Sequence, residues 1–127
     1  MADVVAKAEQ AINARQYAQA LPLLQEMVRS VEPLAAKNPT YARWTEYAIF
    51  YIGVCQLESG QFDPAATQLE SYRQRYPLGV FLGPSWMLTL DALAGKKDWP
   101  AVAALAPEIV RKNVLSGPLL SAVHKLW

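Results

Sequence analysis

The amino-acid sequence of 127 residues predicts an all-α protein. Apolar and small side chains recur three and four positions apart in nearly every segment, which is the spacing of one face of an α-helix. No segment alternates between apolar and polar residues as a half-buried strand does. Prolines and glycines interrupt the pattern at intervals, so we expect several helices joined by short turns.

Three helices are expected in the N-terminal part of the chain. The first covers residues 3–14, with Asp3 as its N-cap, because Asp accepts hydrogen bonds from the free N–H groups at a helix start. The second begins at Tyr17, and Pro33 marks where it breaks down. The third is expected over residues 40–59, and its apolar residues cover most of its circumference, as in a buried helix.

Four more helices are expected in the rest of the chain. The fourth covers residues 64–76, with Asp63 as its N-cap. The fifth opens at Pro84, and Asp98 repeats the same cap pattern before the sixth. A seventh begins at Pro118 and continues to the last residue.

The composition excludes several classes of protein. Hydrophobic residues make up 53% and charged residues 18%, which excludes intrinsic disorder and indicates that some apolar surface meets a neighbour. The net charge of +1 gives no electrostatic footprint for nucleic acid or an anionic membrane. We find no pattern of a targeting signal, and the longest uncharged run, residues 76–90, is too short to span a bilayer. The compartment, cytoplasmic or periplasmic, stays open.

The residues that usually carry chemistry are scarce. His124 is the single histidine and Cys55 the single cysteine, so the set of ligands for a metal site is missing. Cys55 is interpreted as a small core residue. The glycine-containing stretch at residues 79–83 lacks the lysine and hydroxyl of a phosphate-binding loop. We therefore expect no enzyme activity and no cofactor.

The second helix pair carries the most informative pattern. A small residue, Gly53, lies in its first helix, and Phe62 follows a glycine in the turn. The next helix presents Ala65 and Leu69 on one face, and the unit ends at Pro77. This unit resembles a tetratricopeptide repeat, a helix–turn–helix whose stacked copies build a solenoid. Its Tyr-Pro ending and its Gly-x-Phe-x-x-Ala turn are most similar to those of bacterial cell-envelope repeat proteins.

The resemblance extends to the other helix pairs. Tyr17 stands where the second pair has Phe62, and Trp99 stands there in the third. The third pair departs from the pattern at Leu90, where the family has a small residue. The Gly-Pro pairs at residues 83 and 117 lie 34 residues apart, which equals the family period. A different α–α superhelix or a helical bundle stays the alternative to this interpretation.

The resemblance implies a right-handed α–α superhelix of about three helix-turn-helix repeats plus a final helix. We expect one helical-repeat domain over residues 1–127, with repeats at about 1–37, 40–79 and 83–114 and a partial fourth at 117–127.

In this family the first helices of successive repeats line a concave groove that holds peptides. Relatives that bind the acidic C-termini of heat-shock chaperones use lysine, asparagine and arginine there, whereas this chain has Val5, Glu9 and Tyr51. An apolar groove with a few acidic groups instead suits an amphipathic helix or a hydrophobic peptide. The alternative for Tyr47 and Phe50 is that they pack as core under the second helix. The implied groove residues are Val5, Glu9, Ile12, Asn13, Tyr47, Phe50, Val54, Leu57, Glu58, Met87 and Asp91.

We therefore expect a non-enzymatic scaffold that binds another protein or a peptide, as part of a longer protein. The alternative is a regulatory or self-association domain of a larger multidomain protein or enzyme. The expected helix at 117–127 is apolar on both sides, which predicts a homodimer through the C-terminal helix unless further chain covers it.

Overall fold

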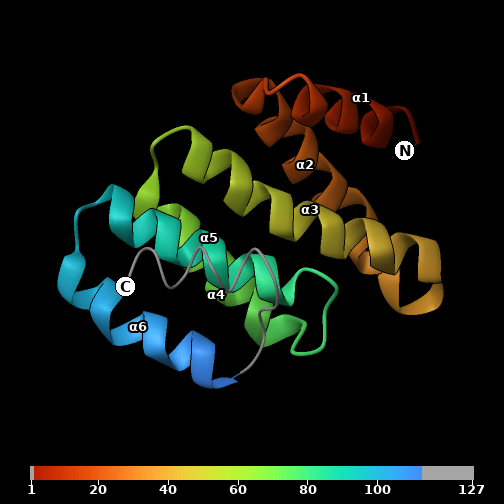
Figure 1. Cartoon of the computed structure of the whole chain (residues 1–127). Coiled ribbons are helices and arrows are strands. Elements are labelled where there is room, and N and C mark those ends of the chain that lie inside the picture. The colour runs from red at the N-terminus through yellow and green to blue at the C-terminus, as the bar shows by residue number, and fades with distance from the viewer. Residues whose placement is uncertain (1, 113–127) are drawn as a thin grey trace.

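The computed structural model describes residues 2–112, and all regular structure in that range is helical. Each helix packs mainly against the next one along the chain, so the helices stack in order from α1 to α6 (Figure 1). The predicted all-α helical-repeat fold is confirmed for this range, whereas the repeat boundaries stay a prediction. The expected seventh helix and partial fourth repeat lie outside the described residues. The elements are α1 (Ala2–Asn13), α2 (Tyr17–Val31), the 3-10 helix η1 (Glu32–Lys37), α3 (Pro39–Glu58), α4 (Phe62–Arg75), α5 (Leu82–Gly95) and α6 (Trp99–Lys112).

One turn geometry closes all three antiparallel helix pairs. The second residue after each first helix has a positive φ: 59° at Arg15, 79° at Gly60 and 61° at Lys97. The next backbone N–H then donates to the carbonyl five residues earlier, as in a Schellman motif, from Gln16, Gln61 and Asp98 at 2.8–2.9 Å. An aromatic residue opens the second helix each time: Tyr17, Phe62 or Trp99. Only the second turn uses glycine, which tolerates this conformation best.

Several helix starts differ from the predicted ones. Asp63 is not the N-cap of α4, because the helix already begins at Phe62 and Gln61 precedes it. The Asp63 carboxylate lies in the first turn, where it favours the helix dipole, and it pairs with the Lys96 ammonium. Asp3 likewise lies inside α1. The prediction that Asp98 is the N-cap of α6 is confirmed, since the Asp98 Oδ1 accepts a hydrogen bond from the Ala101 N–H at 3.4 Å.

Helix α3 begins at an N-cap residue that was not predicted from the sequence. The Asn38 side-chain oxygen accepts hydrogen bonds from the N–H groups of Thr40 (2.9 Å) and Tyr41 (3.4 Å). Pro39 occupies the first helical position, where its missing N–H removes no helical bond. This cap fixes where the long central helix starts.

Small residues let the paired helices approach closely. Ala8 and Ala65 are fully buried, and Gly53 is buried as well. A Cβ atom added to Gly53 would lie 3.0 Å from the Leu69 side chain of α4, tighter than an ordinary contact. Cys55 is fully buried too, as predicted for a small core residue. The core therefore depends on small residues at the contacts between α3 and its neighbours.

Candidate functional site

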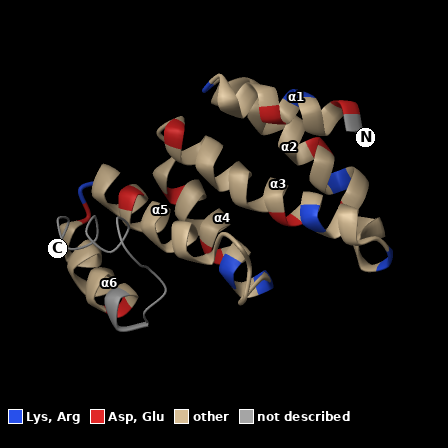
Figure 2. Cartoon of the chain, turned by 45° about the vertical axis from the view of Figure 1, so that its right-hand side comes forward, with Lys and Arg blue, Asp and Glu red and all other residues tan. Residues whose placement is uncertain are grey.

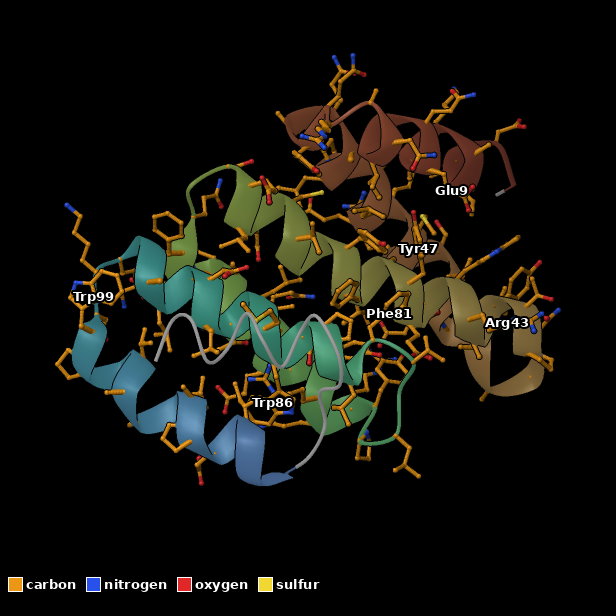
Figure 3. The ribbon with its side chains drawn as sticks, viewed as in Figure 1. Glu9, Arg43, Tyr47, Phe81, Trp86 and Trp99 are labelled. Atoms are coloured by element: carbon orange, nitrogen blue, oxygen red, sulfur yellow. The ribbon has the colours of Figure 1, made fainter. Side chains whose placement is uncertain are left out.

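A pocket with mainly apolar walls opens between α1, α3 and the linker that connects α4 to α5. Its volume is about 280 Å³. Figure 3 shows Glu9 on α1, Arg43 and Tyr47 on α3, and Phe81 next to the start of α5. The lining residues are Val5, Glu9, Arg43, Trp44, Glu46, Tyr47, Val80 and Phe81, and we call this the α1–α3 pocket.

Helical spacing explains which side chains meet there. Val5 and Glu9 are four residues apart on α1, as are Arg43 and Tyr47 on α3, so each pair lies on one helix face. Trp44, three residues before Tyr47, shares that face. Val5 is only 7% exposed, whereas Tyr47 and Trp44 are half-buried with part of each ring accessible. The pocket therefore offers aromatic walls that a ligand can contact.

Glu46 fastens the linker to the rim of the pocket. Its Oε2 accepts a hydrogen bond from the Tyr72 hydroxyl at 2.7 Å and another from the Val80 N–H at 3.0 Å. The Tyr72 hydroxyl oxygen in turn accepts from the Phe81 N–H at 2.9 Å. Burial, and then the bond to Glu46, raise the pKa of the Tyr72 hydroxyl, so it stays a donor. These bonds join the linker to α3 and α4 and hold Val80 and Phe81 in place.

The linker presents apolar side chains to solvent beside the pocket. Leu78 is 95% exposed and Val80 is 80% exposed, the highest values among the large exposed hydrophobic residues of the described range. Single exposed apolar residues are normal on a protein surface, but a group beside an apolar pocket is typical of interaction sites. Leu78 and Val80 therefore extend the apolar surface of the pocket outward.

Two residues on this side of the molecule, Tyr47 and Asp91, have raised pKa values, and nearby carboxylates contribute to both shifts. Burial raises the pKa of the Tyr47 hydroxyl, and the nearby Tyr51 hydroxyl and Glu9 carboxylate raise it further. The Asp91 carboxyl on α5 is partly buried although the residue as a whole is exposed, and this partial burial raises its pKa. The charge of Glu58 at the end of α3 adds to that shift. The geometry agrees, since Glu9 and Tyr47 line the same pocket and the neighbours of Glu58 and Asp91, Leu57 and Ala92, pack in one core cluster.

The structure brings together three of the groove residues that the resemblance implied. Val5, Glu9 and Tyr47 line the α1–α3 pocket. Of the others, Ile12, Val54 and Met87 are half-buried beside the core clusters, and Asn13, Glu58 and Asp91 are exposed. None of these six lines the α1–α3 pocket, and whether they contact a partner stays a prediction.

The prediction was wrong for two side chains. Phe50 is only 4% exposed and packs among aromatic rings, and Leu57 is 9% exposed and packs against Ala65 and Ala92. Both point toward α4 and α5, because α3 is surrounded by helices on most of its circumference. The alternative, core packing, therefore holds for Phe50, although its neighbours are on α4 and the linker more than on α2.

Five lining residues were missed: Arg43, Trp44, Glu46, Val80 and Phe81. Trp44 could have been found, since it lies one turn from Tyr47 on the same helix face. The positions of Val80 and Phe81 could not, because they depend on hydrogen bonds that span 34 residues to Glu46 and nine to Tyr72.

A larger hollow lies elsewhere, among α2, α3 and α4, with a volume of about 620 Å³. Its walls are mostly amide and guanidinium groups, and Arg75 there pairs with Glu32 at 2.8 Å. Within it, Gln68 Nε2 donates to the Ile49 carbonyl at 3.0 Å. Because a binding site for an apolar side chain needs apolar walls, the smaller α1–α3 pocket is the stronger candidate.

The described range gives no sign of other site types. Among residues 2–112 no group of three or more His, Cys, Asp or Glu side chains is placed to hold a metal ion. No helix in the described part of the chain is long and apolar enough to cross a membrane. Charged positions are scattered over a mostly uncharged ribbon (Figure 2).

Comparison with known proteins agrees with the helix-pair geometry. The family model of the tetratricopeptide repeat matches residues 47–78. This segment runs from Tyr47 through the turn at Gly60 to Leu78, so it contains most of α3 and all of α4. Neither the curated proteins nor the solved structures include a match to the chain. Residues 47–78 are therefore a tetratricopeptide repeat.

Proposed function

We propose that the chain holds a segment of another protein by enclosing an apolar side chain of that segment in the α1–α3 pocket. A tetratricopeptide repeat indicates a protein–protein interaction scaffold. The observation that carries the proposal is the group of aromatic and aliphatic walls that α1, α3 and the linker supply to one pocket. Its volume of about 280 Å³ lies just below the range of small-molecule and cofactor sites, roughly 300–1,000 Å³, and suits one or two side chains.

The surroundings of the pocket support the same function. Leu78 and Val80 add exposed apolar surface at its edge, and a group of exposed apolar side chains beside a pocket is typical of interaction sites. Glu46 and Tyr72 hold the linker in position before any partner arrives, which lowers the entropy cost of binding.

The test is a selection of random peptides displayed on phage against the immobilised chain, followed by titration of enriched peptides. We expect enriched peptides with a large apolar residue, and we expect Tyr47→Ser to weaken their binding at least tenfold. Val80→Ser gives a second probe of the pocket, because Val80 is 80% exposed and its replacement leaves folding intact. Leu34→Ser, at an exposed apolar position on η1, is the matched control and should bind normally.

A peptide that binds wild type, Tyr47→Ser and Val80→Ser with equal affinity would show that the pocket is not the binding site. The absence of any enriched peptide would also count against the proposal.

A further inference from the structure

The accessible side of α3 forms one stripe with an apolar middle and charged ends. Tyr47, Tyr51, Val54 and Glu58 follow each other four, three and four residues apart, so they lie on one face of the helix. Tyr51 and Val54 are half-buried and Glu58 is exposed. At 1.5 Å per residue, Glu58 lies about 16 Å along the helix from Tyr47. The stripe therefore leads from the α1–α3 pocket to an acidic end.

That acidic end contains two carboxylates that repel each other. Glu58 and Asp91 are both exposed, and they lie close together because their sequence neighbours Leu57 and Ala92 pack in one core cluster. The Glu58 charge accordingly helps to raise the pKa of Asp91. Among the described residues, the ion pairs are Arg75–Glu32 and Lys96–Asp63, so neither Glu58 nor Asp91 has a cationic partner within the described chain. A cation placed between them would relieve the repulsion.

The other end of the stripe, at the α1–α3 pocket, is also acidic. Glu9 lines the pocket and belongs to neither ion pair of the described range, and Arg43 is the single basic group in the lining. Glu46 is already bonded to Tyr72 and Val80. Arg15 borders the same hollow as Glu58, but acidic side chains still outnumber basic ones along the stripe.

We propose that the occupant of this face is a basic amphipathic segment of a partner protein. Its apolar side chain enters the α1–α3 pocket, and a lysine or arginine about 16 Å further along lies between Glu58 and Asp91. An acidic segment would place like charges opposite each other, which disfavours binding. This inference rests on the proposed function, and it adds the charge and spacing of the ligand.

The test uses two synthetic fluorescein-labelled peptides of about 15 residues, long enough for the roughly 16 Å span in helical form. Both carry leucine and tryptophan on one helix face, and one has lysine at the polar positions where the other has glutamate. Binding to the full chain is measured by fluorescence anisotropy at low and high salt. We expect the lysine peptide to bind at least about tenfold more tightly at low salt, with the difference reduced at high salt.

Charge-reversal variants test whether Glu58 and Asp91 are the residues that attract the lysine peptide. Glu58→Lys and Asp91→Lys should each weaken the lysine peptide about threefold to tenfold and strengthen the glutamate peptide. Glu26→Lys is the matched control, because Glu26 is exposed on α2 and changes the net charge equally. If Glu26→Lys weakens binding as much as the other two, only net charge matters and the inference is overturned.

The remaining outcomes separate this inference from the proposed function. Equal binding of both peptides, lost in Tyr47→Ser, would keep the pocket as the site and overturn the basic partner. Binding of neither peptide overturns the basic partner and leaves the phage selection to decide the proposed function. A dimer of the chain alone, dissociated by Tyr47→Ser in sedimentation experiments, would assign the face to a second copy and overturn the inference.

Discussion

Phe50 and Phe81 stack face to face, with ring centroids 4.4 Å apart and planes 4° from parallel. Tyr51 and Tyr72 each meet Phe81 edge-on, with centroids at 5.8 and 6.2 Å. Offset-stacked and edge-to-face arrangements are the favourable geometries for aromatic pairs. The linker residue Phe81 is therefore held to α3 and α4 by ring contacts as well as by hydrogen bonds, and Phe50 forms part of the base beneath it.

Replacing Phe50 with alanine should destabilise the protein by about 3–5 kcal/mol, because a buried aromatic side chain leaves a cavity when it is removed. Urea denaturation followed by circular dichroism measures the change. Val80→Ala is the control, and its effect should stay within about 0.5 kcal/mol because Val80 is 80% exposed. A small effect of Phe50→Ala would show that the ring contributes to the surface and not to the core.

Ala65→Leu should cost about 1–3 kcal/mol through overpacking. Ala65 is fully buried beside Leu57 and Ala92, so it has no free space for a larger side chain. Thr67→Leu, at an exposed position of the same helix, provides the comparison and should leave the melting temperature nearly unchanged. Equal melting temperatures for both variants would mean that α3 and α4 do not cross closely at Ala65.

Glu46→Ala should release the linker from α3. The change removes the acceptor of the Tyr72 hydroxyl and of the Val80 N–H. Tyr72 is fully buried, and leaving its hydroxyl unpaired costs about 1–3 kcal/mol, whereas the exposed Val80 N–H can bond to water instead. Hydrogen exchange should become faster at the amides of Val80 and Phe81 than elsewhere. Glu46→Gln keeps an acceptor oxygen and should have a smaller effect, and Glu26→Ala should have none. Unchanged exchange at both amides in Glu46→Ala would contradict the assigned role of Glu46.

Local patterns allowed the helices to be predicted, because each helix is decided by residues within a few positions. The predicted helices agree with the described ones to within a few residues, and Cys55 is core as expected. The positive φ of Lys97 was not predicted, because lysine carries no preference for that conformation. Such a conformation depends on the packing of α5 against α6 more than on local propensity.

The candidate site was predicted only in part, since it depends on which helix faces meet. Spacing placed Tyr47 and Phe50 on overlapping faces of α3, but a difference of three residues turns a side chain by about 60°. That turn is enough to leave Tyr47 at the pocket and to bury Phe50 beneath Phe81. The position of the linker follows from long-range bonds to Glu46, and no local pattern in the sequence encodes it.

Cys55 should react slowly with thiol reagents while the protein is folded. The side chain is fully buried, and burial followed by the Glu58 charge raises its pKa from 9.0 to about 11. The thiolate is the reactive form, so at pH 8 its fraction falls about a hundredfold relative to an unperturbed thiol. Alkylation by iodoacetamide, followed by mass spectrometry, should show this protection in buffer and its loss in urea.

The same shift has a consequence for stability. Because the folded pKa lies above the unfolded one, the unfolded state loses its proton first as the pH rises, and the free energy of unfolding falls between about pH 9 and 11. Cys55→Ala should flatten this part of the pH profile. An identical decline in wild type and Cys55→Ala would assign the effect to other groups.

Arg73 should be essential for docking α5 on α4. Its Nη1 donates to the Ser85 carbonyl at 3.1 Å and to the Thr89 Oγ1 at 2.8 Å, and its guanidinium lies 3.9 Å from the centre of the Trp86 ring. Burial lowers its pKa to about 10, so the group remains charged at neutral pH. Lysine cannot reproduce this planar set of contacts, so Arg73→Lys should cost about 2–3 kcal/mol.

Arg75→Lys separates the loss of these contacts from a general effect of the substitution. Arg75 lies on the same helix, and its ion pair with Glu32 is 41% exposed on both sides, so the change should cost less than about 0.5 kcal/mol. Hydrogen exchange should accelerate across α5 in Arg73→Lys and stay unchanged there in Arg75→Lys. If α5 is equally protected in both variants, the apolar contacts between α4 and α5 are sufficient and Arg73 is not required.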